Sequence, residues 1–435
     1  MGKSCCNFLL LNMARDNISI AVGIDIGSTN VRTVIVQHFT GEENPRVIGV
    51  SQIPSSGIRR GVITDVEDVI KTVNESVERA EHMAGVQVKR AIVNIGGGDI
   101  GFQSSKGVIA IGRADGEVIE DDVNRVISEA QIISLPMNRE IVHVLAKKYR
   151  LDDQDNIKDP IGMKGVRLEV DALIIESSSV HIKNISKCAY QSNIEIDDLV
   201  LEPLAAARAV LTKKQKELGV VLVNIGGGTT SIAVYEEGEL LHSAIIPVGA
   251  GHITNDIAIG LRTSIDVAEK IKLEYGSAIS KDISKKEGID LSQIDSQEEG
   301  VVSRHHVAEI IEARLEEIFD LVQKELKLIG KAGLLPSGAI LVGGGAKMTH
   351  AGDLAKEILG LPVQIGFPLG LGGMLDKVDD PSFATVAGLI LWPESHGVVA
   401  VQNSKFMGSK AINIFTKEAG DTAQKAGNWF KKFLP

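Results

Sequence analysis

The chain has 435 residues, of which 44% are hydrophobic and 24% charged, and its formal net charge is −11. This length is too great for one compact core, so we expect two or more domains. The acidic balance argues against a general nucleic-acid binder, which usually presents a basic face, and we expect no nucleic-acid partner. Three cysteines cannot form a disulfide framework and fit a reducing cytosol.

No apolar run approaches the roughly 20 residues that a membrane-spanning helix needs. Residues 1–18 are interpreted as an N-terminal extension without an assigned role. Gly2 and Cys6 lie in a stretch that looks like a lipidation signal, but Cys6 stands where myristoylation favours Ser or Thr. The sequence leaves open whether Met1 or Met13 is the true start.

The first structured segment, residues 19–39, predicts two strands joined by a tight turn at 25–29, because apolar residues alternate on both sides of that turn. Residues 66–84 predict a helix with one apolar face. Residues 90–95 predict a buried strand.

Residues 106–181 have a different pattern. Short strands alternate there with a helix near 120–134 and a polar loop at 152–159, so we interpret the stretch as an inserted domain. Residues 199–211, around Pro203, predict an apolar helix.

The opening pattern then recurs. Residues 220–223 predict a strand, 224–230 a glycine-rich turn, and 231–235 the returning strand. The two hairpins lie about 200 residues apart, which indicates two related halves.

The last third of the chain contains two further helices, a strand and a weakly ordered end. Residues 263–275 and 303–329 predict helices, and 339–342 predict a strand that runs into a glycine triplet. Residues 396–418 resemble a linker, and 419–435 predict a terminal helix.

Glycine-rich turns suit an anion, because the absence of a side chain lets successive backbone N–H groups point at phosphate oxygens. One such turn is weak evidence, since hairpins also use glycine for steric reasons. Two turns at equivalent places, with a third glycine run after a strand, outline a nucleotide held between two halves. The candidate contacts are Gly27, Ser28, Thr29, Asn30, Gly226, Gly227, Gly228, Thr229, Thr230, Gly343, Gly344, Gly345 and Lys347.

A similar run at residues 94–99 (NIGGGD) lies just before the inserted domain. It has no evident partner in the repeat, so we interpret it as a structural turn.

Four charged residues are further candidates. Asp25, at the mouth of the first turn, suits Mg²⁺ held through water, although an Asp also caps its own turn. Glu202 precedes Pro203 and suits the orientation of an attacking water, or equally an acid in the first turn of a helix. Glu269 and Lys272 share one helix face and suit a ribose or base contact, or a solvated ion pair.

These residues carry a resemblance to a known superfamily. The segments resemble the signature of the actin, chaperone and sugar-kinase superfamily at 22–29 (VGIDIGST), 199–205 (LVLEPLA), 224–230 (NIGGGTT) and 340–346 (ILVGGGA). Four more are similar to segments specific to the FtsA family: 160–168 (PIGMKGVRL), 252–257 (HITNDI), 268–276 and 361–366 (LPVQIG). The resemblance covers roughly 20–394 and the terminal helix.

The resemblance implies an α/β, two-lobed, actin-like ATPase fold with an inserted subdomain and a C-terminal amphipathic helix. It divides the chain into a first lobe (19–105 and 182–218), an insert (106–181), a second lobe (219–262 and 331–395) and a small subdomain (263–330). ATP and Mg²⁺ would lie between the lobes.

The family also implies partners. Its members polymerise through the insert and bind the C-terminal tail of FtsZ on the small subdomain, where Arg304 lies in a matching segment. Other division proteins would join this assembly at the cytoplasmic face of the membrane.

Three positions depart from the family pattern. Asn224 and Ser231 stand where carboxylates are usual, and Asn30 replaces a common Lys. Asn224 can still hydrogen-bond a metal-bound water but brings no charge. We therefore expect ATP binding with slow or negligible turnover.

The final residues predict an amphipathic helix. Trp429, Phe430, Phe433 and Leu434 share one stripe, with Lys431 and Lys432 outside it. Such a helix lies in the interface of an anionic membrane, although it can instead dock on its own domain. Each Lys near anionic lipid contributes about 1 kcal/mol, so one helix binds weakly and a filament binds by avidity.

Two alternatives remain open. One is a pilus-assembly adaptor of the PilM type, which shares the fold and the insert. The other is a small-molecule kinase, which the loss of carboxylates at Asn224 and Ser231 disfavours.

Overall fold

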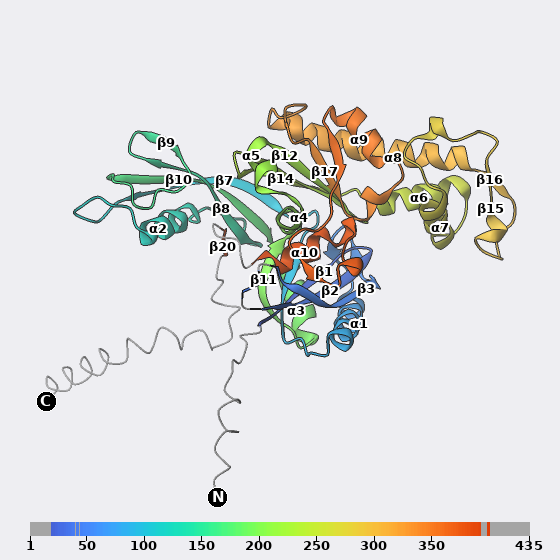
Figure 1. The fold of residues 1–435 in the computed structure, drawn as a ribbon, viewed down its shortest axis with the longest axis horizontal. Coiled ribbons are helices and arrows are strands. Elements are labelled where there is room, and N and C mark those ends of the chain that lie inside the picture. Colours follow the sequence, from blue (N-terminus) through green and yellow to red (C-terminus); the bar gives the residue numbers. More distant parts are fainter. Residues whose placement is uncertain (1–18, 40, 43, 393–397, 401–435) are drawn as a thin grey trace, which may run out of the picture. The chain divides into compact units, whose positions relative to one another are not determined.

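The structure is a computed structural model that describes residues 19–39, 41–42, 44–392 and 398–400. The described residues from 19 to 399 form one compact unit, which contains two sheets of equivalent topology, an inserted sheet and a small helical subdomain (Figure 1). The predicted extension 1–18 and terminal helix 419–435 lie outside the described residues. So does the predicted linker, apart from a short strand, β20 (Val398–Ala400).

The first lobe is built on a six-stranded sheet with the order β11-β6-β1-β2-β3-β19. Its strands are β1 (Ser19–Ile26), β2 (Asn30–His38), β3 (Arg46–Pro54), β6 (Arg90–Ile95), β11 (Glu195–Leu201) and β19 (Gly372–Gly373). Helices α1 (Val66–Ala84) and α3 (Ser179–Gln191) pack together beside this sheet. A two-stranded ribbon of β4 (Ile58–Arg59) and β5 (Val62–Ile63) precedes α1.

Helix α1 shows why the sequence signal was strong there. The Asp65 carboxylate accepts hydrogen bonds from the backbone N–H groups of Glu67 and Asp68, which caps the helix start. The chain leaves the helix at Gly85, whose φ of 69° favours glycine. The predicted bounds 66–84 are therefore those observed.

The second lobe repeats this topology with the order β14-β13-β12-β17-β18. Its strands are β12 (Val220–Ile225), β13 (Thr230–Glu236), β14 (Glu239–Ile246), β17 (Ala339–Val342) and β18 (Val363–Ile365). In both lobes the first strand pairs antiparallel with the next strand and parallel with a strand that is distant in sequence. The internal recurrence predicted from the hairpins is thus present in the sheets.

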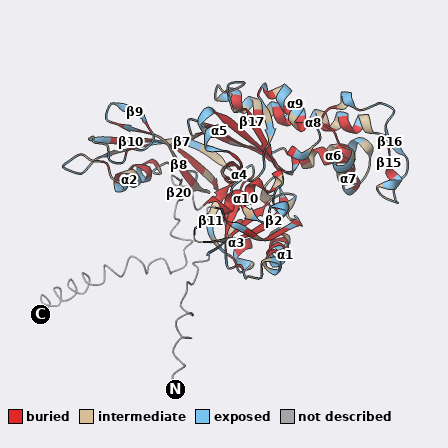
Figure 2. Cartoon of the chain, in the orientation of Figure 1, coloured by how far each residue is buried: buried red, intermediate tan, exposed pale blue. Residues whose placement is uncertain are grey.

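Two apolar helices lie between the lobes. Helices α4 (Glu202–Val210) and α10 (Ala384–Ile390) pack on each other, α10 also on β1 and α4 also on β12 and β13. One buried cluster spans both helices and both sheets, as the burial colouring shows (Figure 2). Residues 199–201 belong to β11 rather than to the predicted helix, which begins at Glu202 because Pro203 is tolerated only in the first turn.

The remaining helices cover the second lobe and build the small subdomain. They are α5 (Lys213–Leu218), α6 (Ala250–Leu261), α7 (Ile265–Tyr275), α8 (Arg304–Leu328) and α9 (Ala351–Leu359). A hairpin of β15 (Gly288–Asp290) and β16 (Val301–Ser303) lies beside α6 and α7 (Figure 1). Single 3-10 turns occur at Ser280–Asp282, Leu291–Gln293, Gly344–Lys347, Leu375–Lys377 and Pro381–Phe383.

The insert is an antiparallel sheet covered by one helix. Strand β10 (Arg167–Ser178) pairs with β7 (Gly101–Ala110) and β8 (Arg139–Leu151), and α2 (Glu120–Ala130) packs on β7 and β10. The polar stretch predicted as a loop contains β9 (Gln154–Ile157), which pairs with β8 as a hairpin. The prediction missed this strand because its exposed residues are polar.

Candidate functional site

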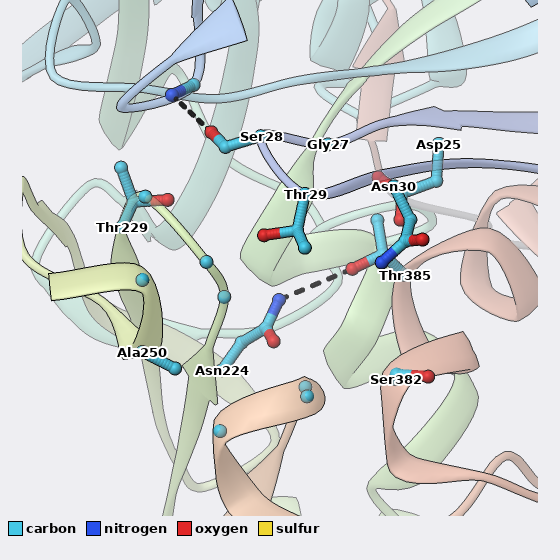
Figure 3. Close-up of a pocket in the computed structure, with 18 of the residues that line it drawn as sticks. Asp25, Gly27, Ser28, Thr29, Asn30, Asn224, Thr229, Ala250, Ser382 and Thr385 are labelled. Atoms are coloured by element: carbon cyan, nitrogen blue, oxygen red, sulfur yellow. Dashed lines mark hydrogen bonds between the residues drawn. The ribbon is translucent and has the colours of Figure 1, made fainter. Parts of the chain in front are cut away.

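A cavity of about 380 Å³ lies between the two lobes, where the two glycine-rich hairpin turns meet (Figure 3). A Cβ added to Gly227 would lie 1.7 Å from the Thr29 hydroxyl oxygen, and one on Gly228 would lie 2.6 Å from that of Ser28. A Cβ on Gly228 would also lie 2.9 Å from the Arg60 Cα, so a side chain there would force the backbone to shift, whereas at Gly227 the nearest atom belongs to the Thr29 side chain.

The first turn is held by its own backbone and by a neighbouring loop. The Gly27 N–H donates to the Asn30 carbonyl at 3.1 Å, which closes the turn. The Ser28 hydroxyl accepts a hydrogen bond from the Gly61 N–H at 2.9 Å (Figure 3). Gly27, Ser28, Thr29 and Asn30 all line the cavity, as the sequence predicted.

The second turn lies against the start of helix α6. The N–H groups of Ala250 and Gly251 donate to the carbonyl oxygens of Gly226 and Gly227, each at 2.8 Å. The first turn of a helix carries partial positive charge, which suits an anion. Because its first N–H groups are already paired within the protein, the start of α6 contributes the partial positive charge of the helix, rather than free donors, to this side of the cavity.

The third glycine run follows β17. Gly343 has a φ of 86°, and a Cβ there would lie 2.4 Å from the Asn224 amide oxygen. The run therefore lets the second hairpin approach closely. Gly343, Gly344, Gly345 and Lys347 line the cavity, and Lys347 forms an ion pair with Asp380.

Asp25 and Glu202 bring two carboxylates to the cavity. Burial raises the pKa of Asp25 to about 6, an effect that the charge of Arg32 opposes. Burial and, less strongly, the charge of Asp25 raise the pKa of Glu202 to about 8. Both shifts have burial as their main cause, so removal from water makes negative charge costly at this site.

The second hairpin surrounds Glu202 with neutral groups. The Asn224 amide donates to the Glu202 carboxylate at 2.7 Å and to the Thr385 hydroxyl at 3.3 Å. The Ser231 hydroxyl lies 3.5 Å from the same carboxylate oxygen. Asn224 and Ser231 are directly opposite each other in the β12–β13 pairing.

Glu269 and Lys272 line the cavity from helix α7. The Lys272 ammonium lies 2.6 Å from the Glu269 carboxylate and donates to the Thr254 hydroxyl at 2.9 Å. Lys272 is 7% exposed, so the pair is not the solvated ion pair of the alternative interpretation.

The glycine run at 94–99 has a partner in the repeat, which corrects the interpretation above. It follows β6, which pairs parallel with β1 as β17 pairs with β12, so it corresponds to the run after β17. Asn94 and Gly96 line the cavity, and a Cβ on Gly96 would lie 2.8 Å from the Glu202 carboxylate. The interpretation from sequence was wrong because residues 94–99 resemble the hairpin turn at 224–230, whereas their true counterpart is the glycine run at the end of β17.

Thr230 was predicted to contact the nucleotide but does not line the cavity, and Arg304, predicted as a partner contact, lies elsewhere in the small subdomain. Thr230 is fully buried in β13, and its hydroxyl donates to the Val248 carbonyl at 2.8 Å. Arg304 begins helix α8, where its guanidinium contacts the Glu287 carboxylate at 2.7 Å and the Tyr275 carbonyl at 3.1 Å. The predicted membrane residues 429–434 lie outside the described residues.

Several lining residues were not predicted: Arg32, Gln52, Gly61, Asn94, Gly96, His181, Ala250, Ser382 and Thr385. Arg32 had a readable signal, because a turn centred on residues 27–29 places it directly across from Asp25. Ser382 and Thr385 come from a segment that no sequence pattern connects to the hairpins.

The donor set fits Mg²⁺ held mainly through water. Within the part of the chain that the structure describes, no group of three or more His, Cys, Asp or Glu is placed to hold a metal. Mg²⁺ usually keeps several waters and takes one or two carboxylates together with substrate phosphates. Asp25 and Glu202 offer these oxygens, and the Asn224 amide lies between the two lobes (Figure 3).

Comparison with known proteins gives the family. Residues 221–388 match the family described as "Cell division protein FtsA", and residues 97–176 match "SHS2 domain inserted in FTSA". The protein of that name from Pseudomonas aeruginosa is 38% identical over 371 residues, which is 85% of this chain and 88% of that protein. The protein from Bacillus subtilis is 37% identical, and the alignment covers 91% of this chain and 86% of that protein. The protein from Escherichia coli is 31% identical, with coverage of 95% of this chain and 98% of that protein.

Solved structures give the fold. A chain of a "PilM-PilN type IV pilus biogenesis complex" aligns with a TM-score of 0.62 at 14% identity. The alignment covers 86% of this chain and 99% of that one. The ethanolamine utilization protein EutJ from Carboxydothermus hydrogenoformans aligns at 0.50 and 18% identity, over 86% and 90% of the two chains. These likenesses establish the fold alone, so the pilus-assembly alternative is not favoured.

Among the described residues, no helix is both long and apolar enough to cross a membrane. The predicted two-lobed, actin-like α/β fold with an inserted domain is confirmed. The sequence relatives are 30–38% identical over most of the chain. The chain therefore belongs to the FtsA family and is a cell division protein with an actin-like fold.

Proposed function

We propose that this protein binds ATP between its lobes and, as a filament, anchors FtsZ to the cytoplasmic face of the membrane at the division site. The observation that carries the nucleotide part is the cavity itself. Backbone turns from both lobes and the start of α6 converge there, which is the arrangement that binds phosphate without basic side chains.

Asp25, with Asn224, would hold Mg²⁺ through water, and the cation would supply positive charge for the phosphates. The turn N–H groups of residues 28–30 and 227–229 would orient the phosphates, while those of Gly27 and Gly226 close the two turns. Glu269 and Lys272, already fixed by Thr254, would meet the ribose or base from α7.

Turnover would be slow or negligible. In many phosphoryl-transfer sites further carboxylates hold the metal and orient the attacking water. Asn224 and Ser231 add no charge beside Glu202. A conformational role for ATP, rather than rapid hydrolysis, follows from this chemistry.

The small subdomain is the proposed site for the FtsZ tail. Helices α6 and α7 and strand β16 expose Ile259, Ile265 and Val301. Exposed apolar side chains on neighbouring elements suit a short peptide. Arg304 remains a candidate contact at one third exposure (32%), but its guanidinium already has two partners within this subdomain.

Membrane attachment would come from the helix that the sequence predicts at residues 419–435. Its apolar stripe (Trp429, Phe430, Phe433 and Leu434) would enter the lipid interface, and Lys431 and Lys432 would meet anionic headgroups. Other division proteins would join the same assembly.

Flotation with anionic liposomes and FtsZ tests the adaptor function. The full chain should carry FtsZ up with the vesicles, and a chain ending after Gly420 should carry none. If the full chain floats and FtsZ stays behind, the FtsZ proposal fails while membrane binding stands. If neither chain floats, the membrane proposal fails.

Titration with a fluorescent ATP analogue tests the nucleotide part separately. We expect saturable binding that unlabelled ATP reverses. Hydrolysis at the rate of a kinase would contradict slow turnover, and absence of binding would overturn the assignment of the cavity.

A further inference from the structure

Three cavity-lining residues form a row across adjacent strands of the first sheet. Asp25 on β1 is directly opposite Arg32 on β2, and Arg32 is directly opposite Gln52 on β3. In the equivalent hairpin of the second lobe, Asn224 and Ser231 occupy the opposed positions. Only the hairpin with the carboxylate therefore has an arginine across from it.

Two neighbouring side chains hold the Arg32 guanidinium in place. Its Nε donates to the Gln52 amide oxygen at 3.1 Å, and its Cζ lies 5.4 Å from the centroid of the Phe383 ring. The side chain is only 12% exposed. A guanidinium fixed in this way loses little conformational freedom when a ligand arrives.

The contact with Asp25 is close but loose. Nη1 of Arg32 lies 3.6 Å from Oδ2 of Asp25, beyond an ordinary hydrogen bond but within ion-pair range. The Asp25 side chain is 10% exposed, so water screens the attraction poorly. The carboxylate is thus compensated without being locked into a bidentate pair.

The two lysines that line the cavity each already form an ion pair with a carboxylate of the protein. Lys272 pairs with Glu269, and Lys347 pairs with Asp380. Among the described residues, Arg32 is the cation that compensates Asp25. Without it, a buried carboxylate would face the phosphates of a nucleotide.

We propose that Arg32 is a positioning residue that acts as a built-in counter-ion for Asp25, so that the cavity accepts a nucleoside triphosphate even without a divalent cation. The proposal rests on the nucleotide-binding function proposed above. In this proposal the Arg32 guanidinium neutralises the Asp25 carboxylate, a role that Mg²⁺ would otherwise have to fill.

The test compares the affinity for a fluorescent ATP analogue in Mg²⁺ and in EDTA. The proteins are the full chain, Arg32→Gln, Arg32→Lys, Asp25→Asn and the double variant Arg32→Gln with Asp25→Asn. We expect Arg32→Gln to weaken binding about tenfold in EDTA and less than about threefold in Mg²⁺, because the cation replaces the lost charge. Arg32→Lys should restore most of the binding in EDTA.

Arg46→Gln is the matched control. Arg46 also pairs with a carboxylate, Glu42, and its Cζ lies 5.0 Å from the centroid of an aromatic ring, Phe39, but it is exposed and away from the cavity. This variant should bind like the unmodified chain in both buffers. Circular dichroism on each variant verifies folding.

The double variant separates neutralisation from direct contact. If Arg32 acts through Asp25, the loss in EDTA disappears when residue 25 is Asn. A loss that persists undiminished shows that Arg32 contacts the nucleotide itself and overturns the proposal. Unchanged binding by Arg32→Gln also overturns it and leaves nucleotide binding intact, whereas no binding by the unmodified chain overturns the proposed function and this inference together.

Discussion

The His143 imidazole, in strand β8 of the insert, accepts a hydrogen bond at 3.0 Å from the backbone N–H of Leu201, the residue before Glu202. His143 is fully buried, its ring centroid lies 5.6 Å from that of Trp392, and burial lowers its pKa to about 4. The ring is therefore neutral at physiological pH. The insert thus supports the strand end that presents Glu202 to the cavity.

Replacing His143 with Ala should destabilise the fold and disturb the cavity. The Leu201 N–H would be left buried without its acceptor, which costs about 1–3 kcal/mol, and the lost ring would add a void. Denaturant unfolding measures the first effect and nucleotide titration the second. His82→Ala, at an exposed position of α1, should change neither. Equal stability of the two variants would contradict the role of His143.

The pH dependence of stability should report the raised pKa of Glu202. The pKa rises from 4.5 to about 8 on folding, so the folded state holds a proton that the unfolded state releases. Stability of the nucleotide-free protein should then fall as pH rises between 4.5 and 8, and it should be highest at the acid end of this window.

Urea unfolding between pH 6.5 and 8 isolates this effect, because the proton exchange of His143 lies between 4 and 6.5 and that of Lys216 above 8. The loss should be on the order of 1 kcal/mol per pH unit, and Glu202→Gln should flatten it. A slope that is unchanged in the variant would show that another group is responsible.

Gly96→Ala should displace Glu202. The new Cβ would lie 2.8 Å from the carboxylate, whereas one on Gly98 would only touch Pro247 at 4.0 Å. We expect Gly96→Ala to lower the melting temperature and weaken nucleotide binding severalfold, with Gly98→Ala close to the unmodified chain. Equal effects of the two substitutions would mean that the loop tolerates a side chain beside Glu202.

The insert also contacts the second lobe through lysines on its β8–β9 hairpin. Lys148 lies 3.4 Å from the Glu237 carboxylate, and Lys158 lies 3.4 Å from that of Glu217. These exposed pairs contribute less than about 1 kcal/mol each to global stability.

Changing both lysines to Glu should therefore loosen the hairpin without unfolding the protein. Hydrogen exchange should become faster in β8 and β9 and remain unchanged in β1 and β12. Lys106→Glu, on β7 beside Asp171 within the insert, should not have this effect. Uniform exchange in the double variant and the unmodified chain would exclude the lysine contacts as a restraint.

Local sequence patterns predicted the elements well where the signals agree. Helix α1 has a cap at Asp65, an apolar face and a terminal Gly85, so its bounds follow from the chain alone. Strand β9 was missed because its residues are polar, and its pairing with β8 depends on a partner rather than on its own composition.

The sequence by itself determined that two glycine-rich hairpins recur, and recurrence was enough to predict two lobes and the glycine-rich turns that line the cavity between them. The sequence also identified the family, because each family motif is a continuous stretch of residues. Only the tertiary structure decided the charge balance of the site. Asp25 is compensated by Arg32, Glu202 packs on Gly96, and Thr230 faces the core instead of the cavity. The approach of Gly96 to Glu202 depends on parallel pairing between distant segments, which no local pattern encodes. Asp25 and Arg32 are opposed across one local hairpin, but their burial is set by the tertiary structure.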